Sequence, residues 1–368
     1  MNILVTGANG FIGKNLIFQL RENKEFKIFS YVRESTKEEL SQWISQADFI
    51  FHLAGVNRPK EPSEFKEVNT DLTESVCDLL KEKGKKTPIL FSSSIQAALD
   101  NAYGKSKLEA EDFLKRLQSE NGNPVFIFRL PNVFGKWCRP NYNSVIATFC
   151  HNIARDLPVK INDPDTNIVL AYIDDVVDKF ISVLKNSSQN FDQNLITYKI
   201  TLGELYATLQ SFKQSRRDLI IPNVGTGLNR ALYATFTSHL DTNSFSYSIP
   251  QYKDQRGVFV EMLKTQDAGQ FSFFTAYPGV TRGEHYHHSK IEKFLVITGK
   301  AKFRFRNIIT NEYFETFTEG DSPQVVESIP GWTHDITNVG REEMIVMLWA
   351  SEIFDRSRPD THSCKIDL

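Results

Sequence analysis

Two groups of residues in this chain have the types and spacing that catalysis requires. The first is a serine run, 92–94, followed by Tyr103 and Lys107. Because Tyr103 and Lys107 are four residues apart, they share one face of a helix, where the ammonium can lower the pKa of the phenol. Ser94, Tyr103 and Lys107 are therefore candidates for proton transfer, with Ser93 as the alternative to Ser94. A tyrosine and a lysine at this spacing are common by chance, so the surrounding motifs must decide.

The second group lies in a stretch, 285–334, that holds half of the eight histidines. On a strand, His285 and His287 project from the same face. Together with Glu292 and His334 they offer three imidazoles and a carboxylate, a donor set that suits a divalent ion such as Zn²⁺. The sequence predicts a metal site at these four residues, whereas any one histidine alone would be read as packed or solvent-facing. Their neighbours are expected to be exposed flanks: His288, Lys290 and Lys293.

A glycine-rich turn, VTGANGFIG at residues 5–13, follows an apolar run and opens a helical stretch. Gly7 permits the chain reversal, Gly10 lets backbone N–H groups approach a pyrophosphate, and Gly13 allows the helix to pack closely on the strand. The helix N-terminus favours phosphate. An ordinary strand-to-helix turn is the alternative. The predicted contacts with a dinucleotide, from this turn, from residues 52–55 and from the later pair, are Gly7, Asn9, Gly10, Phe11, Ile12, Gly13, Leu53, Ala54, Gly55, Tyr103 and Lys107.

The residues after the next apolar run bear on the choice of dinucleotide. An acid at this place would bond the ribose 2′-hydroxyl of NAD, but the chain has Tyr31, Val32 and Arg33 here. Arg33, with Lys37 nearby, suits the 2′-phosphate of NADP. The prediction is therefore NADPH, with Arg33 as a cofactor contact. The alternative is a solvated Arg33 and a ribose bound by Glu34.

Two kinds of element must position these groups. From residue 1 to about 220, short β-rich runs alternate with longer helical stretches, the pattern of a parallel sheet covered on both faces. Beyond a Pro, Gly, Asn and Thr-rich passage with one short helix, closely spaced strands separated by turns indicate a barrel or jelly roll. We therefore predict an α/β protein with an N-terminal Rossmann doubly wound parallel sheet, 1–243, and a C-terminal all-β domain, 244–368.

Composition excludes several classes of protein. The chain has 368 residues with 40% hydrophobic and 24% charged, which is ordinary for two globular domains. A net charge of -2 without a basic block argues against nucleic acid as a partner. Four scattered cysteines suit a reducing compartment. With neither a signal-peptide pattern nor 18 consecutive apolar residues, we expect a soluble cytoplasmic protein that does not contact a membrane.

The first 180 residues resemble the extended short-chain dehydrogenase/reductase family of nucleotide-sugar enzymes. The glycine turn, HLAG at 52–55, the serine run and the Tyr103–Lys107 pair carry the resemblance, with RLPNVFG at 129–135 and YIDDV at 172–176. It implies a catalytic triad of Ser94, Tyr103 and Lys107, and contact of Asn132 with the sugar nucleotide. Only eight residues separate Ser94 from Tyr103, fewer than in many relatives, which implies a shortened active-site loop.

The last third of the chain resembles cupins, whose two motifs match the spacing of His285, His287, Glu292 and His334. Residues 254–261, DQRGVFVE, and 279–286, GVTRGEHY, also resemble dTDP-4-dehydrorhamnose epimerases. In that family the histidine matched by His285 is the base, and Arg282 would contact the substrate. Those epimerases work without a metal, whereas the cupin motif makes His285 a metal ligand. One nitrogen cannot be base and ligand at once, so the two resemblances conflict at His285. The additional His287 and Glu292 favour the metal.

The whole chain resembles the CapF-type bifunctional enzymes of capsular polysaccharide synthesis. A proton on C3 of a hexose is acidic while C4 is a ketone, so C3 epimerisation in the cupin would precede C4 reduction by NADPH. The resemblance implies a homodimer that converts UDP-2-acetamido-2,6-dideoxy-4-keto-L-hexose to UDP-2-acetamido-2,6-dideoxy-L-talose, on the route to UDP-N-acetyl-L-fucosamine. The alternatives are a nucleotide-sugar 4-epimerase or dehydratase with tightly held NAD and a structural, dimerising cupin, or a non-enzymatic nucleotide-sensing or assembly protein.

Overall fold

A computed structural model describes residues 1–59, 61, 63–186, 194–250, 252–254, 257–259, 262–265, 269–352 and 357–367. The chain forms two compact units. The first comprises 1–134, 141–144 and 168–199, and the second 135–140, 145–167 and 200–368. The change from helices to antiparallel strands falls between residues 238 and 246. The two helices that immediately precede that change, within 200–238, belong to the same compact unit as the strands after it. The domain boundary near residue 243 stays a prediction.

The first unit contains the predicted parallel sheet, with strand order β2-β1-β3-β4-β5. Its strands are near-continuous apolar runs because both faces are covered. The strand order reverses between β1 and β3, the place where open α/β sheets bind ligands beyond the carboxyl ends of their strands. The strands are β1 (Asn2–Thr6), β2 (Lys27–Tyr31), β3 (Phe49–His52), β4 (Ile89–Ser94) and β5 (Val125–Leu130).

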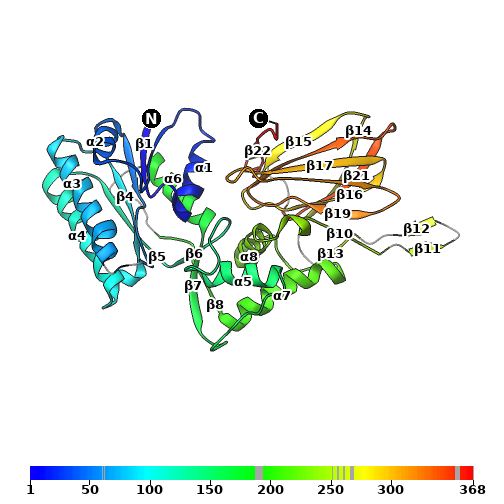
Figure 1. The fold of residues 1–368 in the computed structure, drawn as a ribbon, viewed down its shortest axis with the longest axis horizontal. Helices are drawn as coiled ribbons and strands as arrows, with labels where there is room; N and C mark the ends of the chain where they lie inside the picture. The colour runs from blue at the N-terminus through cyan, green and yellow to red at the C-terminus, as the bar shows by residue number, and fades with distance from the viewer. Residues whose placement is uncertain are drawn as a thin grey trace. The chain divides into compact units, whose positions relative to one another are not determined.

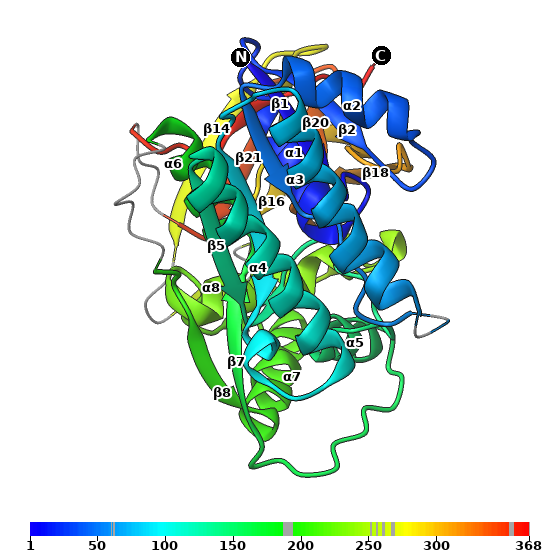
Figure 2. The same ribbon diagram turned by 90° about the vertical axis from the view of Figure 1, so that its left-hand side faces the viewer.

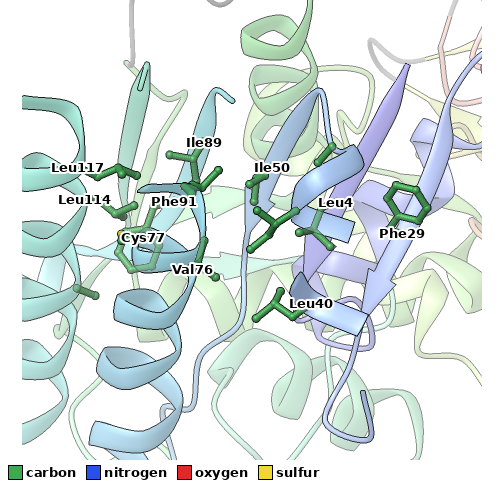
Figure 3. Close-up of a cluster of buried hydrophobic side chains, with 14 residues drawn as sticks. Leu4, Phe29, Leu40, Ile50, Val76, Cys77, Ile89, Phe91, Leu114 and Leu117 are labelled. Carbon is green, nitrogen blue, oxygen red and sulfur yellow. The ribbon is translucent and has the colours of Figure 1, made fainter. Parts of the chain in front are cut away.

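Helices cover both faces of this sheet (Figures 1 and 2). On one face, α2, α3 and α4 enclose a core in which Leu4, Ile50 and Phe91 of the strands meet Val76 and Leu114 of the helices (Figure 3). On the other face, α1 packs against α6. These helices are α1 (Phe11–Leu20), α2 (Lys37–Gln46), α3 (Leu72–Glu82), α4 (Ala102–Asn121) and α6 (Ile173–Lys185), with short helical turns at Phe65–Asp71 and Ile95–Ala98.

Several shorter strands and helices lie along the chain between the parallel sheet and the antiparallel strands. The strands β6 (Asn132–Phe134), β7 (Asn167–Tyr172) and β8 (Tyr198–Thr201) form a small sheet, and β9 (Ile220–Ile221) pairs with β13 (Lys264–Thr265). The helices are α5 (Val145–Ala154), α7 (Leu202–Asp218) and α8 (Gly227–Ser238), the short helix expected there. A capping box formed by Thr201 and Glu204 fixes the start of α7. None of the helices in the described ranges has the length and hydrophobicity that a transmembrane span requires.

Most of the strands after residue 245 form two antiparallel sheets that face each other (Figure 1), β10-β19-β16-β21-β14 and β18-β17-β20-β15-β22. Apolar side chains from both sheets fill the space between them, including Phe294, Val346, Phe303 and Ile336. The alternation of KAKFRFRN places Ala301, Phe303 and Phe305 inside. This is the predicted jelly-roll architecture.

These strands are β10 (Ser246–Ser248), β14 (Gln270–Ala276), β15 (Thr281–Tyr286), β16 (Glu292–Thr298), β17 (Lys300–Asn307), β18 (Tyr313–Glu319), β19 (Gln324–Glu327), β20 (Trp332–Asn338), β21 (Met344–Ala350) and β22 (His362–Ser363). A short helical turn, Thr242–Ser244, precedes them. A separate hairpin joins β11 (Tyr252–Asp254) to β12 (Gly257–Phe259). Of the epimerase-like segment 254–261, residues 255, 256, 260 and 261 lie outside the described residues.

Candidate active site and metal-binding cluster

The glycine turn joins β1 to α1, as predicted. Gly7 has a φ of +67°, and a Cβ there would lie 2.7 Å from the main chain of Ala54. A Cβ on Gly13 would lie 2.3 Å from the Gly7 carbonyl oxygen. Both distances are shorter than any carbon contact allows, so the turn requires glycine at these two positions. Gly10 precedes the first turn of α1, where backbone N–H groups lack partners within the helix.

Two cavities run along this turn and share four lining residues. The larger, about 570 Å³, reaches from the turn past the end of β2 to Arg33 and Lys37. The smaller, about 270 Å³, reaches past the ends of β3 and β4 to Tyr103. Together they form an extended groove at the point where the strand order reverses. Every residue predicted to contact a dinucleotide lines one or both: Gly7, Asn9, Gly10, Phe11, Ile12, Gly13, Arg33, Leu53, Ala54, Gly55, Tyr103 and Lys107.

Two cationic side chains, Arg33 and Lys37, line the larger cavity beyond the end of β2. Arg33 is 76% exposed on its side chain and pairs with Glu64 at 3.2 Å. Lys37 lines the same end, whereas Glu34 is exposed and lies outside the lining. This arrangement supports a 2′-phosphate more than a free ribose hydroxyl at this position, although Glu67 and Asp71 also line the cavity. The choice between NADPH and NADH stays a prediction.

The predicted proton-transfer residues line the smaller cavity together. Ser94 ends β4, and Tyr103 and Lys107 lie in the first two turns of α4. Burial raises the pKa of Tyr103, and a hydrogen bond with Ser94 offsets part of that rise. The phenol therefore stays protonated at neutral pH and can donate a proton. Asn132 lines the same cavity.

Ser93, the alternative to Ser94, has a different partner. Its hydroxyl donates a 2.6 Å hydrogen bond to Glu111, which is buried on α4. The same carboxylate accepts two hydrogen bonds from the Arg129 guanidinium, at 2.8 and 2.7 Å. Because Ser93 is bound in this network and Ser94 bonds the phenol, the geometry favours Ser94 over Ser93 as the serine of the predicted proton-transfer group.

Lys107 is fully buried beside the cavity. Its ammonium donates to the Ser92 carbonyl at 3.0 Å and lies 4.7 Å from the centre of the Phe91 ring. Burial lowers the pKa of Lys107 to about 8, and Glu111 opposes that shift. A Cβ on Gly55 would lie 3.0 Å from the same nitrogen, so glycine there keeps the space beside the ammonium open.

If the chain carries out the reduction that its resemblance implies, the pH profile of that reaction should report this lysine. If the ammonium helps to hold the cofactor and to ease proton release from Tyr103, kcat/KM should fall as pH rises through about 8, because the buried lysine then loses its charge. The fall should approach tenfold per pH unit. Steady-state kinetics from pH 6 to 10 measure it, and a profile that stays flat to pH 9.5 would contradict the assignment. Lys107→Arg should shift the descending limb upward.

His52, buried at the end of β3, lies next to the residues that line the groove. Thr6 accepts the N–H groups of Leu53 and Ala54 at 3.1 and 3.2 Å, and its hydroxyl lies 2.8 Å from Nδ1 of His52. On the other side of the ring, Nε2 lies 2.8 Å from the Thr73 hydroxyl. Burial lowers the pKa of His52 to about 3, and the charge of Lys107 adds to this effect. The imidazole is therefore neutral and holds the Thr6 hydroxyl that accepts from Leu53 and Ala54.

The four predicted metal ligands converge inside the β-sandwich. Their ligand atoms lie within 4.8 Å of one another. Oε2 of Glu292 is 4.0 Å from Nε2 of His285, 3.2 Å from Nε2 of His287 and 3.4 Å from Nε2 of His334. Burial lowers the pKa of His334 to about 4, so this ring is neutral, as a ligand must be.

The imidazoles of His285 and His287 are held in place by contacts of their Nδ1 atoms with backbone carbonyls. Nδ1 of His285 lies 3.0 Å from the Gly283 carbonyl, and Nδ1 of His287 lies 2.6 Å from the Asp360 carbonyl. These contacts place the hydrogen on Nδ1 and leave Nε2 free. The Nε2 atoms of both rings are buried without a hydrogen-bond partner among the described residues. Buried lone pairs that face one carboxylate fit a divalent cation.

The predicted exposed flanks are wrong for two of three residues. Lys290 and Lys293 are 5% and 1% exposed, and His288 is partly buried. Lys290 donates to the Pro359 carbonyl and the Thr361 hydroxyl, while Lys293 pairs with buried Glu327. Their partners lie 34 to 71 residues away along the chain, so local sequence spacing gave no sign of them.

Among the described residues, Arg282 makes its contacts with β14 and not with the four residues of the histidine cluster. Its guanidinium donates to the Thr275 carbonyl at 3.0 Å and lies 5.1 Å from the centre of the Phe274 ring, both on β14. The side chain is exposed. Its contact with substrate stays a prediction.

Sequence reasoning missed several residues of these sites. Glu111 lies four residues after Lys107, so helical spacing could have revealed it. Tyr142 and Asn143 line the two cavities from a loop whose position no local pattern indicates. Asp360 contacts the histidine cluster from more than 70 residues away. Only the three-dimensional fold shows the last three.

Two family models match separate parts of the chain. The NAD dependent epimerase/dehydratase family matches residues 3–196, and the polysaccharide biosynthesis C-terminal domain matches residues 252–362. Among curated proteins, UDP-2-acetamido-2,6-beta-L-arabino-hexul-4-ose reductase of Pseudomonas aeruginosa is 55% identical over 368 residues, which cover 100% of this chain and 99% of that protein. GDP-6-deoxy-D-talose 4-dehydrogenase of Aggregatibacter actinomycetemcomitans is 28% identical over 58% of this chain and 78% of its own.

Solved structures show the same division. The capsular polysaccharide assembling protein CapF from Staphylococcus aureus is 43% identical with a TM-score of 0.68, covering 99% of this chain and 100% of that one. UDP-glucuronic acid 4-epimerase from Bacillus cereus, solved with NAD, covers 58% of this chain and 84% of its own at 19% identity and a TM-score of 0.52, which is a likeness of fold alone. Of these relatives, the two that match nearly the whole chain are the ones with high identity.

Proposed function

Since this chain belongs to the CapF-type family, whose N-terminal part is of the NAD dependent epimerase/dehydratase family, we propose that it reduces the C4 ketone of a UDP-linked sugar with NADPH. The observation that carries the proposal is the meeting of Ser94, Tyr103 and Lys107 in one cavity that continues into the dinucleotide groove. A relative 55% identical over the whole chain is named as a reductase of such a ketone.

The groove residues have separate tasks in this reaction. The nicotinamide, when bound, supplies hydride to C4. Tyr103 donates its phenolic proton to the C4 oxygen, which the Ser94 hydroxyl also hydrogen-bonds. Lys107 holds a positive charge beside the cavity, which favours departure of the phenolic proton. Asn132, at the wall of the cavity, contacts the sugar nucleotide. Glu111 and Arg129 keep Ser93 away from the reacting oxygen.

The name of that relative supports UDP-2-acetamido-2,6-dideoxy-4-keto-L-hexose as the proposed substrate. The proposed product, which the resemblance to CapF-type enzymes implies, is UDP-2-acetamido-2,6-dideoxy-L-talose, on the route to UDP-N-acetyl-L-fucosamine for capsule or surface polysaccharide. A homodimer in the cytoplasm is part of the same proposal.

The β-sandwich is proposed to bind a divalent metal, Zn²⁺ in the first instance. His285, His287, Glu292 and His334 fit such an ion because their donor atoms lie close to one another. The buried Nε2 atoms of the three histidines have no hydrogen-bond partner among the described residues. A bound cation would polarise a carbonyl and stabilise negative charge on it. The Nδ1 contact of His285 leaves its Nε2 lone pair available, and the convergence of that nitrogen with the donor atoms of the other three residues supports a role as ligand.

Epimerisation at C3 in the β-sandwich is the second proposed step. The C4 ketone makes the C3 proton acidic, so removal and return of that proton must precede reduction. A buried, largely polar cluster inside an apolar sandwich is a suitable place for this exchange. Arg282, on β15 with two of the imidazoles near it in sequence, is the proposed substrate contact.

Isotope exchange and cofactor oxidation test the two steps together. The purified protein is incubated with the 4-keto sugar nucleotide in deuterated solvent, with and without NADPH, and NMR locates the label. We expect deuterium at C3 without NADPH, and stoichiometric NADPH oxidation with a C4 carbinol when NADPH is present. A ketone that stays unreduced with fresh NADPH would refute the reductase. Conversion without net NADPH consumption would indicate a 4-epimerase or dehydratase with tightly held NAD.

Cofactor preference should depend on Arg33. Arg33→Ala removes a cation from the end of the larger cavity and should weaken NADPH binding about tenfold, which corresponds to loss of one charge-assisted hydrogen bond. NADH binding should change little, because NADH lacks the 2′-phosphate. Fluorescence titration of both cofactors measures the effect, with Glu34→Gln as the control for the neighbouring charge. Equal losses for NADPH and NADH would exclude contact of Arg33 with the 2′-phosphate.

A further inference from the structure

The turn after β15 is bound by one acid from the far end of the chain. The carboxylate of Asp360 accepts the backbone N–H groups of His288, Ser289 and Lys290 at 2.8, 3.0 and 2.8 Å. The Ser289 hydroxyl donates to it as well, at 3.2 Å. Successive N–H groups that converge on an anion form a nest, and hydrogen bonds to an ionised acceptor are stronger than neutral ones. One carboxylate therefore fixes the course of three consecutive residues.

The main chain of the same acid contacts a metal ligand. The Asp360 carbonyl accepts the Nδ1 hydrogen of His287 at 2.6 Å. Asp360 has a φ of +35°, a conformation that aspartate and asparagine tolerate better than most residues. Its carbonyl thus faces the imidazole while its carboxylate faces the turn that follows the imidazole.

Side chains of the turn bind back to the same segment. The Lys290 ammonium donates to the Pro359 carbonyl at 3.2 Å and to the Thr361 hydroxyl at 2.7 Å. Arg230 of α8 donates to the Ser289 hydroxyl at 2.7 Å. Since this turn joins two of the four proposed ligands, its fixed course limits where both of them can lie.

We propose that Asp360 is a positioning residue for the metal site: it holds His287 in the tautomer and orientation that leave Nε2 free, 3.2 Å from Oε2 of Glu292. Outer contacts of this kind set the affinity of a metal site without touching the ion. The inference rests on the metal site of the proposed function. It assigns to the segment 359–361 a task that neither the histidine spacing nor the reductase chemistry requires.

Zn²⁺ affinity of the full-length protein tests this role, measured by competition with a chromophoric chelator. Asp360→Ala should weaken Zn²⁺ binding 10- to 100-fold. Asp360→Asn should weaken it less, because asparagine tolerates the same φ and keeps one acceptor oxygen. His334→Ala, which removes a ligand, should abolish binding. Asp367→Asn is the matched control, since this nearby acid accepts from Arg304 at 2.8 and 2.9 Å and should bind Zn²⁺ like the parent.

Absorption of the Co²⁺-loaded proteins gives a second readout, because its visible bands follow ligand geometry. We expect shifted bands in Asp360→Asn and parent-like bands in Asp367→Asn. If Asp360→Ala does not fold, Asp360→Asn decides the question. A parent protein that binds no Zn²⁺ would refute the metal site itself. A parent that binds Zn²⁺ while Asp360→Asn binds it within twofold, with unchanged Co²⁺ bands, would overturn the positioning role alone.

Discussion

Tyr103→Phe should lower the rate of NADPH oxidation by about 10²- to 10⁴-fold, the range that a positioned general acid contributes. The phenol lines the catalytic end of the groove, and burial raises the pKa of Tyr103 so that it carries the proton at neutral pH. Phenylalanine keeps the ring and its contact with Phe65, 5.9 Å between ring centres, and removes only the hydroxyl. Stopped-flow or steady-state absorbance at 340 nm measures the loss.

Two controls separate this chemistry from misfolding. NADPH should still bind to the variant, because the glycine turn and the larger cavity are untouched. Deuterium uptake at C3 should also persist, since the proposed proton exchange takes place at the histidine cluster in the other unit. Loss of uptake together with loss of oxidation would show that both steps share one site. Ser93→Ala offers a comparison, because Ser93 bonds Glu111 and should affect the rate far less than Ser94→Ala.

The sequence sufficed for the parts of the fold and site that follow from local geometry. Gly7 and Gly13 must be glycine because neighbouring main chain occupies the space of a Cβ, and the motif states this directly. The spacing of Tyr103 and Lys107 on one helix placed both in one cavity. Alternation in KAKFRFRN gave the inward face of β17. In each case, the period of a single helix or strand determined the outcome.

What the sequence could not supply depends on contacts between distant segments. Lys290 and Lys293 are charged, and charged residues are rarely buried unless paired. Their partners are Thr361 and Glu327, which nothing near residue 290 in the sequence identifies. Residues 200–238 lie in the same compact unit as the β-strands. Contacts between distant segments join them there too, such as the ion pair of Arg216 on α7 with Glu327 on β19. The sequence alone therefore could not predict which distant residues pair with these buried charges.

A second group of buried charges lies around Glu327, the last residue of β19. Glu327 is fully buried and accepts from Lys293 and from Arg216, the latter at 2.5 Å. Burial alone would lower the pKa of Lys293, but Glu327 beside it raises that pKa, so the lysine stays charged. Two cations thus depend on a single carboxylate, with the Tyr247 hydroxyl 3.1 Å from Lys293 as a neutral partner.

Glu327→Gln should destabilise the second unit by about 3–5 kcal/mol, the cost of leaving a buried charge without its counterion. Urea denaturation, followed by tryptophan fluorescence, measures the change. Glu315→Gln is the matched control, because Glu315 pairs with Lys302 at 2.7 Å on the exposed side of β18 and should barely move the midpoint. Equal midpoints for the parent and Glu327→Gln would show that the buried cluster contributes no net stability.

The pH dependence of this difference has a definite sign. Arg216 and Lys293 lower the pKa of Glu327 in the folded protein, although burial opposes them. The carboxylate therefore contributes its stability above the unfolded-state pKa of about 4.3 and loses it as pH falls through the lower folded-state value. The gap between the parent and Glu327→Gln should be full at pH 7 and should narrow below about pH 4. A gap that widens in acid would mean that the carboxylate is protonated in the folded protein, and the cations would then need another counterion.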